Sequence, residues 1–176
     1  MYRLITCTPS TNAGFLSKTF AGGDDPSLSP YTNIIQYVTI ATTGNAIDFG
    51  DLTVARTELT SCSSPTRGIF AGGSTPASST LNTIDYVAIL TTGNAIDFGD
   101  KMNVGAATFR EEAGTAPTRF LIAGGRYFSG GYVETNVIQY VTNVSTGNAQ
   151  DFGDLVCKTS NSQEKSTSCT NGHGGL

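Results

Sequence analysis

The residues with the clearest potential for chemistry are three pairs of aspartates, each within an Asp-Phe-Gly-Asp element. The pairs are Asp48/Asp51, Asp97/Asp100 and Asp151/Asp154. Paired carboxylates can bind Ca²⁺, which prefers oxygen ligands, but the chain has no Asp-x-Asp-x-Asp-Gly loop and no Glu at the right spacing. We therefore expect these aspartates to cap turns by accepting hydrogen bonds from backbone N–H groups. We expect no metal ion and no other cofactor.

Other catalytic arrangements also lack partners in the sequence. His173 is the single histidine, and a catalytic triad or a zinc site would need further groups beside it. The sequence has no Gly-x-Ser-x-Gly element. Its double glycines, such as Gly72-Gly73, are not followed by the Lys-Ser/Thr of a phosphate-binding loop. The chain is therefore predicted not to be an enzyme.

The segments after the double glycines are better candidates for recognition. These segments, 24–31, 74–80 and 126–134, differ from one another, whereas the flanking segments are nearly identical. The third contains the candidate partner-binding residues Arg126, Tyr127, Phe128 and Tyr132. Clustered aromatic residues with an Arg suit glycan stacking or a protein-binding hot spot. The alternative is a long loop that packs its own aromatic side chains.

The elements that would position these loops recur along the chain. Phe49, Phe98 and Phe152 mark a period of about 50 residues, which is typical of propellers and related β-repeats. The units are approximately 1–52, 53–101 and 102–155, followed by a partial unit, 156–176. They form a single repeat domain. Because one repeat cannot bury its apolar face alone, neighbouring repeats must stack.

Each repeat is predicted to contain four antiparallel strands. In the second repeat these are 56–62, 66–71, 82–89 and 95–100, with a hairpin turn at Thr92-Gly93-Asn94. Four short strands per repeat are typical of one propeller blade. We expect the following residues to be mostly buried: Phe70, Ile84, Tyr86, Ile35, Tyr37, Ile138 and Tyr140. Phe49, Phe98 and Phe152 should pack between blades.

Composition excludes several classes of protein. The net charge of −4 argues against nucleic-acid binding, and no apolar run is long enough to insert into a membrane. The N-terminus does not resemble a signal peptide. The cysteines, Cys7, Cys62, Cys157 and Cys169, are expected to be small buried thiols, with a disulfide such as Cys157–Cys169 as the alternative.

Two resemblances follow from these motifs. The double glycines, the tyrosines at 37, 86 and 140, and Arg56 resemble kelch repeats, with Phe in place of the kelch Trp. The amino-acid sequences of the repeats, and the ending Cys-Thr-Asn-Gly-His-Gly-Gly-Leu, are similar to those of repeat arrays of tailed phages and marine metagenomes. These resemblances imply an all-β fold of kelch-like β-propeller blades. They also imply a structural or adhesion role in a phage virion or tail, for a protein that is made in the host cytoplasm.

About three and a half repeats leave the closure of a propeller open. Two chains could form a seven-bladed ring, so that the protein is a homo-oligomer. Residues 2–7 could instead complete a C-terminal half-blade, or the free edges could join chains into an open assembly. The expected partners are other copies, other virion proteins or a host-surface glycan. The alternatives are a cytoplasmic kelch-like interaction scaffold and, less favoured because of the single histidine, a carbohydrate-active propeller enzyme.

Overall fold

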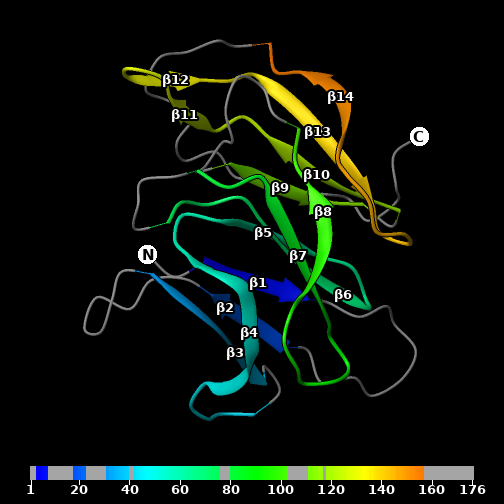
Figure 1. The fold of residues 1–176 in the computed structure, drawn as a ribbon. Coiled ribbons are helices and arrows are strands. Elements are labelled where there is room, and N and C mark those ends of the chain that lie inside the picture. Colours follow the sequence, from blue (N-terminus) through cyan, green and yellow to red (C-terminus); the bar gives the residue numbers. More distant parts are fainter. Residues whose placement is uncertain are drawn as a thin grey trace.

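The computed structural model describes residues 3–7, 18–22, 31–39, 42–75, 80–102, 111–116 and 118–156, with the backbone alone for 3–7, 18–22 and Glu112. Every regular element in these residues is a β-strand (Figure 1). The predicted all-β fold is confirmed. It agrees with a composition poor in charge and rich in Gly and β-branched residues, which favours strands and tight turns.

The strands form three antiparallel sheets of four strands each, and in every sheet the order along the chain is also the order in space. The first sheet contains β1 (Arg3–Cys7), β2 (Lys18–Gly22), β3 (Thr32–Thr39) and β4 (Ile47–Arg56). The second contains β5 (Thr60–Ser63), β6 (Arg67–Ala71), β7 (Thr83–Ala88) and β8 (Ile96–Asp100). The third contains β9 (Glu112–Thr115), β10 (Arg119–Ala123), β13 (Val137–Thr142) and β14 (Gln150–Asp154). Along the chain, β10 and β13 are connected by a separate two-stranded hairpin of β11 (Arg126–Phe128) and β12 (Tyr132–Glu134).

Two expectations from the sequence are wrong. Arg56 does not open a strand of the second repeat but ends β4; the chain then turns at Glu58, which has a φ of +57°, and β5 begins at Thr60. The strand Arg3–Cys7 pairs with β2 inside the first sheet. This strand is the first strand of the four-stranded first sheet, and not the missing part of a C-terminal half-repeat, which contradicts that closure alternative.

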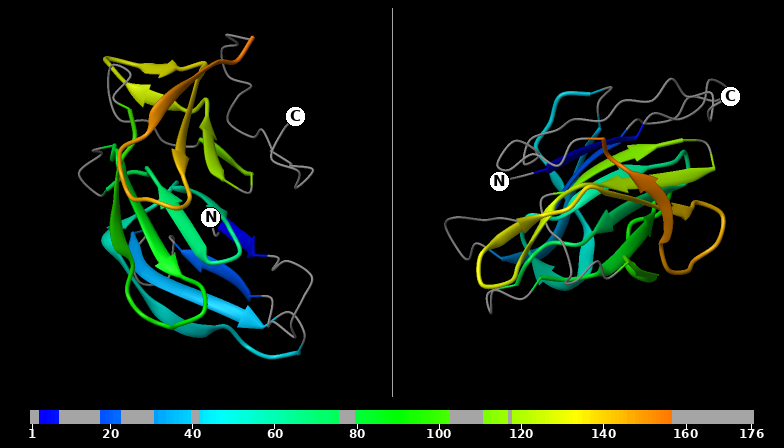
Figure 2. Two further views of the ribbon diagram at one scale, coloured as in Figure 1. Left: turned by 90° about the vertical axis from the view of Figure 1, so that its right-hand side faces the viewer. Right: turned by 90° about the horizontal axis from the view of Figure 1, so that it is seen from above.

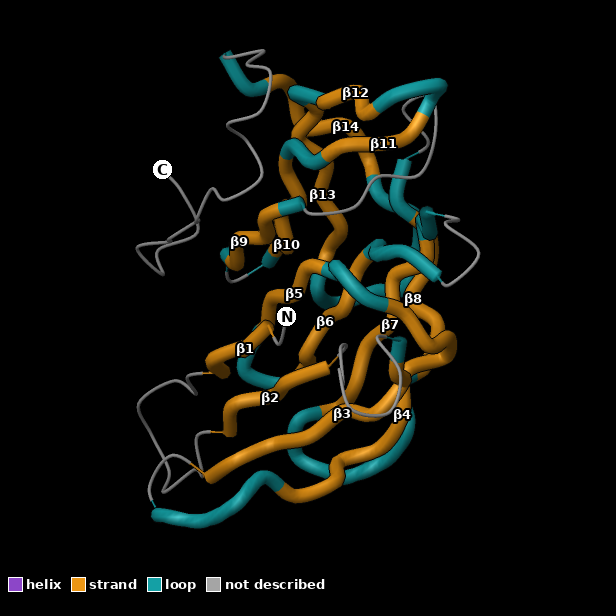
Figure 3. Tube along the Cα trace, turned by 90° about the vertical axis from the view of Figure 1, so that its left-hand side faces the viewer, coloured by secondary structure: helices purple, strands orange, loops and turns teal. Residues whose placement is uncertain are grey.

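The three sheets follow one another along the molecule (Figures 1 and 2). The first strands of the sheets lie side by side, since β1 contacts β5 and β5 contacts β9 (Figure 3). The last strands, β4 and β8, also contact one another. The second sheet therefore lies between the other two.

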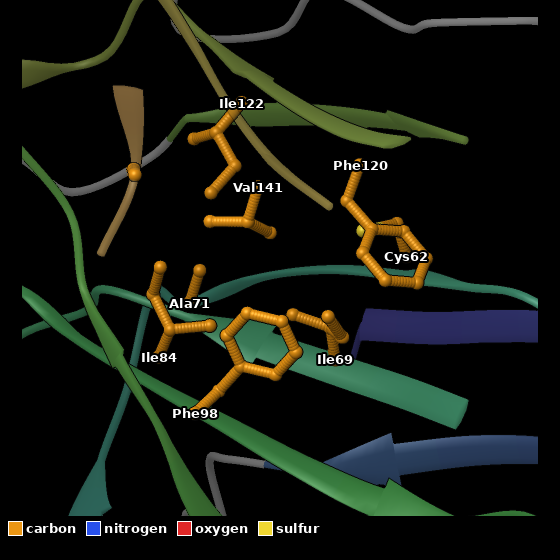
Figure 4. Packing of buried hydrophobic residues seen from close by; sticks show 9 residues of the cluster. Cys62, Ile69, Ala71, Ile84, Phe98, Phe120, Ile122 and Val141 are labelled. Carbon is orange, nitrogen blue, oxygen red and sulfur yellow. The ribbon is translucent and has the colours of Figure 1, made fainter. Parts of the chain in front are cut away.

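Two hydrophobic clusters fill the spaces between the sheets. The cluster between the first and second sheets comprises Ile35, Phe49, Leu52, Leu59, Phe70, Val87, Ile89 and Ala95. The cluster between the second and third comprises Cys62, Ile69, Ala71, Ile84, Phe98, Phe120, Ile122, Val141 and Ala149 (Figure 4). Successive side chains of a strand point to opposite faces, so Phe70 enters the first cluster while Ile69 and Ala71 enter the second.

The predicted core is confirmed in part. Ile35, Phe70 and Ile84 are buried, whereas Tyr37, Tyr86, Tyr140 and Ile138 are half-buried. Phe49 and Phe98 pack between sheets, with 3% and 2% of their surface exposed.

The prediction for Phe152 is wrong, because 51% of its surface is exposed. Within the described residues no fourth sheet covers that face of the third.

Cys62 is a buried thiol, as expected. The side chain of Cys7, together with Cys157 and Cys169, lies outside the described residues.

Candidate functional site

The sequence-predicted recognition loop is an ordered β-hairpin. Arg126 lies opposite Glu134, Tyr127 opposite Val133, and Phe128 opposite Tyr132. The connecting turn contains Gly130, whose φ of +69° is in the left-handed region that favours glycine. Two backbone hydrogen bonds close the base of the hairpin, from Gly124 N to Val137 O at 3.0 Å and from Thr135 N to Gly125 O at 3.0 Å. The hairpin is thus attached directly to the third sheet.

Three of the four predicted binding residues form one stack on this hairpin. The rings of Phe128 and Tyr132 meet edge to face with their centroids 5.6 Å apart. The Arg126 guanidinium lies over the Tyr132 ring, 4.1 Å from its centroid. Phe128 and Tyr132 are nevertheless 60% and 64% exposed. The alternative expected from the sequence was a loop that packs its own aromatic side chains. The two rings do contact one another, but more than half of the surface of each is exposed.

Tyr127 does not join the stack. It alternates with Arg126 and Phe128 along β11 and so belongs to the other face of the hairpin, where it is half-buried opposite Val133. The other two candidate loops are only partly described: Ser74 bridges Thr57 and Thr80, and residues 24–30 and 76–79 lie outside the described residues, as does His173.

The Asp-Phe-Gly-Asp elements have the structural role that the sequence predicts. In each, the first aspartate accepts a hydrogen bond through Oδ1 from the glycine N two residues later, at 3.1–3.2 Å for Asp48, Asp97 and Asp151. The ladder shifts register there, and the phenylalanine is the extra residue of a β-bulge. Within the described residues, no group of three or more His, Cys, Asp or Glu side chains is placed to hold a metal ion.

The same elements also join one sheet to the next. At the first joint, Gly93 N donates to Phe49 O at 2.8 Å and Ala95 N donates to Asp51 O at 2.7 Å. Asn94 Oδ1 in turn accepts a hydrogen bond from Asp51 N at 3.1 Å. We call Phe49-Gly50-Asp51 the strand half of this joint and Gly93-Asn94-Ala95 the turn half.

The second joint repeats this geometry. Gly147 N donates to Phe98 O at 2.7 Å and Ala149 N to Asp100 O at 2.8 Å. Asn148 Oδ1 accepts from Asp100 N at 3.0 Å. The near-identity of the repeats therefore has a physical cause: at both joints a Phe-Gly-Asp fits a Gly-Asn-Ala of the next repeat.

Two buried ion pairs were not predicted from the sequence. Arg56 Nη1 lies 2.9 Å from Asp85 Oδ2, and both side chains are fully buried. Thr53 also donates to Asp85, from its hydroxyl at 2.7 Å and from its backbone N at 3.2 Å. These contacts tie β4 to β7 and hence the first sheet to the second. Burial lowers the pKa of Arg56, and Asp85 opposes that shift.

The second buried ion pair joins Lys101 Nζ to Glu111 Oε2 at 2.5 Å. Burial lowers the pKa of Lys101, and the Glu111 carboxylate opposes the shift. The corresponding positions at the first joint hold Leu52 and Leu59, which are both in the hydrophobic cluster. Lys101 in the place of a repeated leucine is the one sequence signal that could have revealed this site.

A small polar hollow of about 220 Å³ lies beside the turn that connects β13 and β14. Its lining includes Tyr140, whose hydroxyl donates to Gln150 Oε1 at 2.6 Å, and Thr142, whose hydroxyl lies 3.0 Å from that of Ser145. It contains no charged side chain.

No protein-family model matches the chain, and neither does any curated protein. Among solved structures, the fold is similar to that of YjhT, a propeller-type protein, with a TM-score of 0.65 over 87% of this chain. The sequence identity is 9%, so the likeness concerns the fold alone. This chain covers 55% of the YjhT chain, about half of its length. The described part of the chain contains no helix that could span a membrane.

Proposed function

We propose that the chain is a non-enzymatic binding module built from kelch-like propeller blades. Each four-stranded sheet has the meander order of a blade, and the adjacent first strands β1, β5 and β9 suit a radial arrangement. The similarity to YjhT supports the same arrangement. The resemblance of the repeat sequences to phage repeat arrays supports a virion or tail-associated role. The alternative is an intracellular scaffold.

The module binds carbohydrate through the hairpin of β11 and β12. The observation that carries this proposal is the exposure of Phe128 and Tyr132, 60% and 64%, on an ordered hairpin. Exposed aromatic rings offer flat apolar surface to the C–H face of a sugar ring, and Arg126 beside them can donate to hydroxyl or carboxylate oxygens. Loops on a rigid scaffold commonly carry recognition.

A binding experiment tests this proposal. Wild-type protein and the variant Phe128→Ala/Tyr132→Ala are titrated onto a panel of immobilised bacterial surface polysaccharides. Loss of two hot-spot rings should weaken binding at least about 30-fold. The matched control is Leu90→Ala/Val144→Ala, which removes apolar groups that are 64% and 79% exposed on other turns.

The control variant should bind like the wild type. Equal binding by the folded hairpin variant would exclude this surface. Wild-type protein that binds no polysaccharide but retains a protein of the same particle through the hairpin would replace the glycan with a protein partner.

A further inference from the structure

Within the described residues, both halves of an inter-sheet joint are present without a partner at the two ends of the stack of sheets. The first sheet presents a turn half, Gly44-Asn45-Ala46, and the third sheet presents a strand half, Phe152-Gly153-Asp154. These sequences are identical to the halves that meet at the two formed joints. The two ends lie far apart in Figure 1, beyond β3 and β4 at one end and at β14 at the other.

The exposure of equivalent residues separates the formed joints from the open ends. Ala95 and Ala149, in the turn halves of the formed joints, are 8% and 9% exposed, whereas Ala46 is exposed. The strand half at the open end is also uncovered. A Cβ on Gly99 would lie 2.5 Å from Gly147 O, whereas a Cβ on Gly153 would have nothing within 4 Å.

The open strand half already has the geometry of a formed joint. Phe152 packs edge to face on Tyr140 with ring centroids 6.0 Å apart. The corresponding distances are 5.8 Å for Tyr37 and Phe49 and 5.7 Å for Tyr86 and Phe98. Asp151 caps Gly153 as Asp97 caps Gly99. Binding at this surface therefore requires little rearrangement.

We propose that the strand half Phe152-Gly153-Asp154 binds the turn half Gly44-Asn45-Ala46 of a second copy of this chain. By analogy with the formed joints, Gly44 N and Ala46 N of the second copy donate to Phe152 O and Asp154 O, and Asn45 Oδ1 accepts from Asp154 N. This interaction goes beyond the proposed carbohydrate binding and does not depend on it.

The second copy is the occupant that the observations favour, because this chain carries the matching turn half in open form. The length of YjhT agrees, since the part of that fold not covered by this chain is slightly less than half of it. The two surfaces differ, so the contact is head to tail. Such contacts form a ring if the rotation closes and a filament if it does not.

Two charge-introducing variants of the full chain test the proposal. Ala46→Glu places a carboxylate in the turn half, and Phe152→Glu places one in the strand half; both sites are exposed in the single chain, so each variant should fold. Each variant alone should have the mass of one chain by light scattering, at about 0.1 mM, where even a Kd of ~10 µM gives a mostly bound wild type. Val144→Glu, at a site 79% exposed, is the matched control and should associate like the wild type.

Mixing the two variants is the decisive step. The Ala46→Glu chain retains an intact strand half and the Phe152→Glu chain an intact turn half, so an equimolar mixture should form a dimer of one chain of each kind and nothing larger. Circular dichroism confirms that each variant is folded. Wild-type protein that stays monomeric would overturn the proposal. So would variants that associate like the wild type, or a mixture that stays monomeric.

Discussion

At the residue scale, the phenylalanine of the repeated element shows how position decides the role of a side chain. Phe49, Phe98 and Phe152 have the same neighbours in sequence and pack edge to face on equivalent tyrosines. Only the first two are covered by a following sheet. Their contributions to stability should therefore differ.

We expect Phe98→Ala to lower the free energy of unfolding by about 3–5 kcal/mol, because a fully buried aromatic ring leaves a cavity. The matched change Phe152→Ala should cost less, about 0.5–1.5 kcal/mol, because it loses mainly the edge-to-face contact with Tyr140. Urea unfolding, at a protein concentration low enough to keep copies apart, measures both. Equal losses would contradict the assignment of Phe98 to the core between sheets.

The Lys101–Glu111 ion pair gives a second prediction at this scale. Lys101→Leu removes the cation beside a buried carboxylate and should destabilise the protein by about 3–5 kcal/mol. The double variant Lys101→Leu/Glu111→Leu restores the leucine pair of the first joint, Leu52 and Leu59, and should recover most of that loss. A double-mutant cycle by thermal unfolding checks this. A double variant less stable than the single one would show that the apolar pair does not fit the second joint.

At the element scale, the bulged strand before each turn is shaped for the following repeat. Gly50 and Gly99 allow the carbonyl of the next turn to lie against the strand, where a Cβ would come within 2.3 Å of Gly93 O and 2.5 Å of Gly147 O. The backbone hydrogen bonds of the joint depend on that close approach. The joint therefore requires the glycine of the Asp-Phe-Gly-Asp element as well as its phenylalanine.

Alanine at two of these glycines separates the close approach from backbone strain. Gly99 and Gly153 have φ angles of +141° and +140°, so alanine is strained equally at both. Only at Gly99 would the new methyl group also collide with the next turn. We expect Gly99→Ala to be less stable than Gly153→Ala by about 1–3 kcal/mol, the usual effect of overpacking. Chemical denaturation of the two variants in parallel measures the difference, and similar stabilities would show that the turn can move away.

At the scale of the whole molecule, the described chain is a stack of three sheets with two unlike ends. The second sheet is covered on both faces, so it supplies residues to both hydrophobic clusters. The ends carry complementary halves of a joint. Repeat proteins generally need polar terminal units to stay apart. The exposed Phe152 and Ala46 do not provide them.

The sequence by itself determined the local features of this protein. The period of about 50 residues is visible directly in the sequence. The strands and the aspartate caps depend on neighbours within a few positions, and the structure agrees with them. The sequence also identified Arg126, Phe128 and Tyr132 as candidates, and the hairpin places them in one stack.

Only the tertiary structure decided which copies of a repeated element are covered. Phe98 and Phe152 lie in identical Asp-Phe-Gly-Asp elements but differ in burial, because burial depends on whether another sheet packs against the strand, and that sheet is distant in the chain. The same holds for Arg56 and Asp85, which lie on different sheets and pair only after stacking. Such pairings cannot be found from the pattern of one repeat, since the partner of each residue belongs to the next.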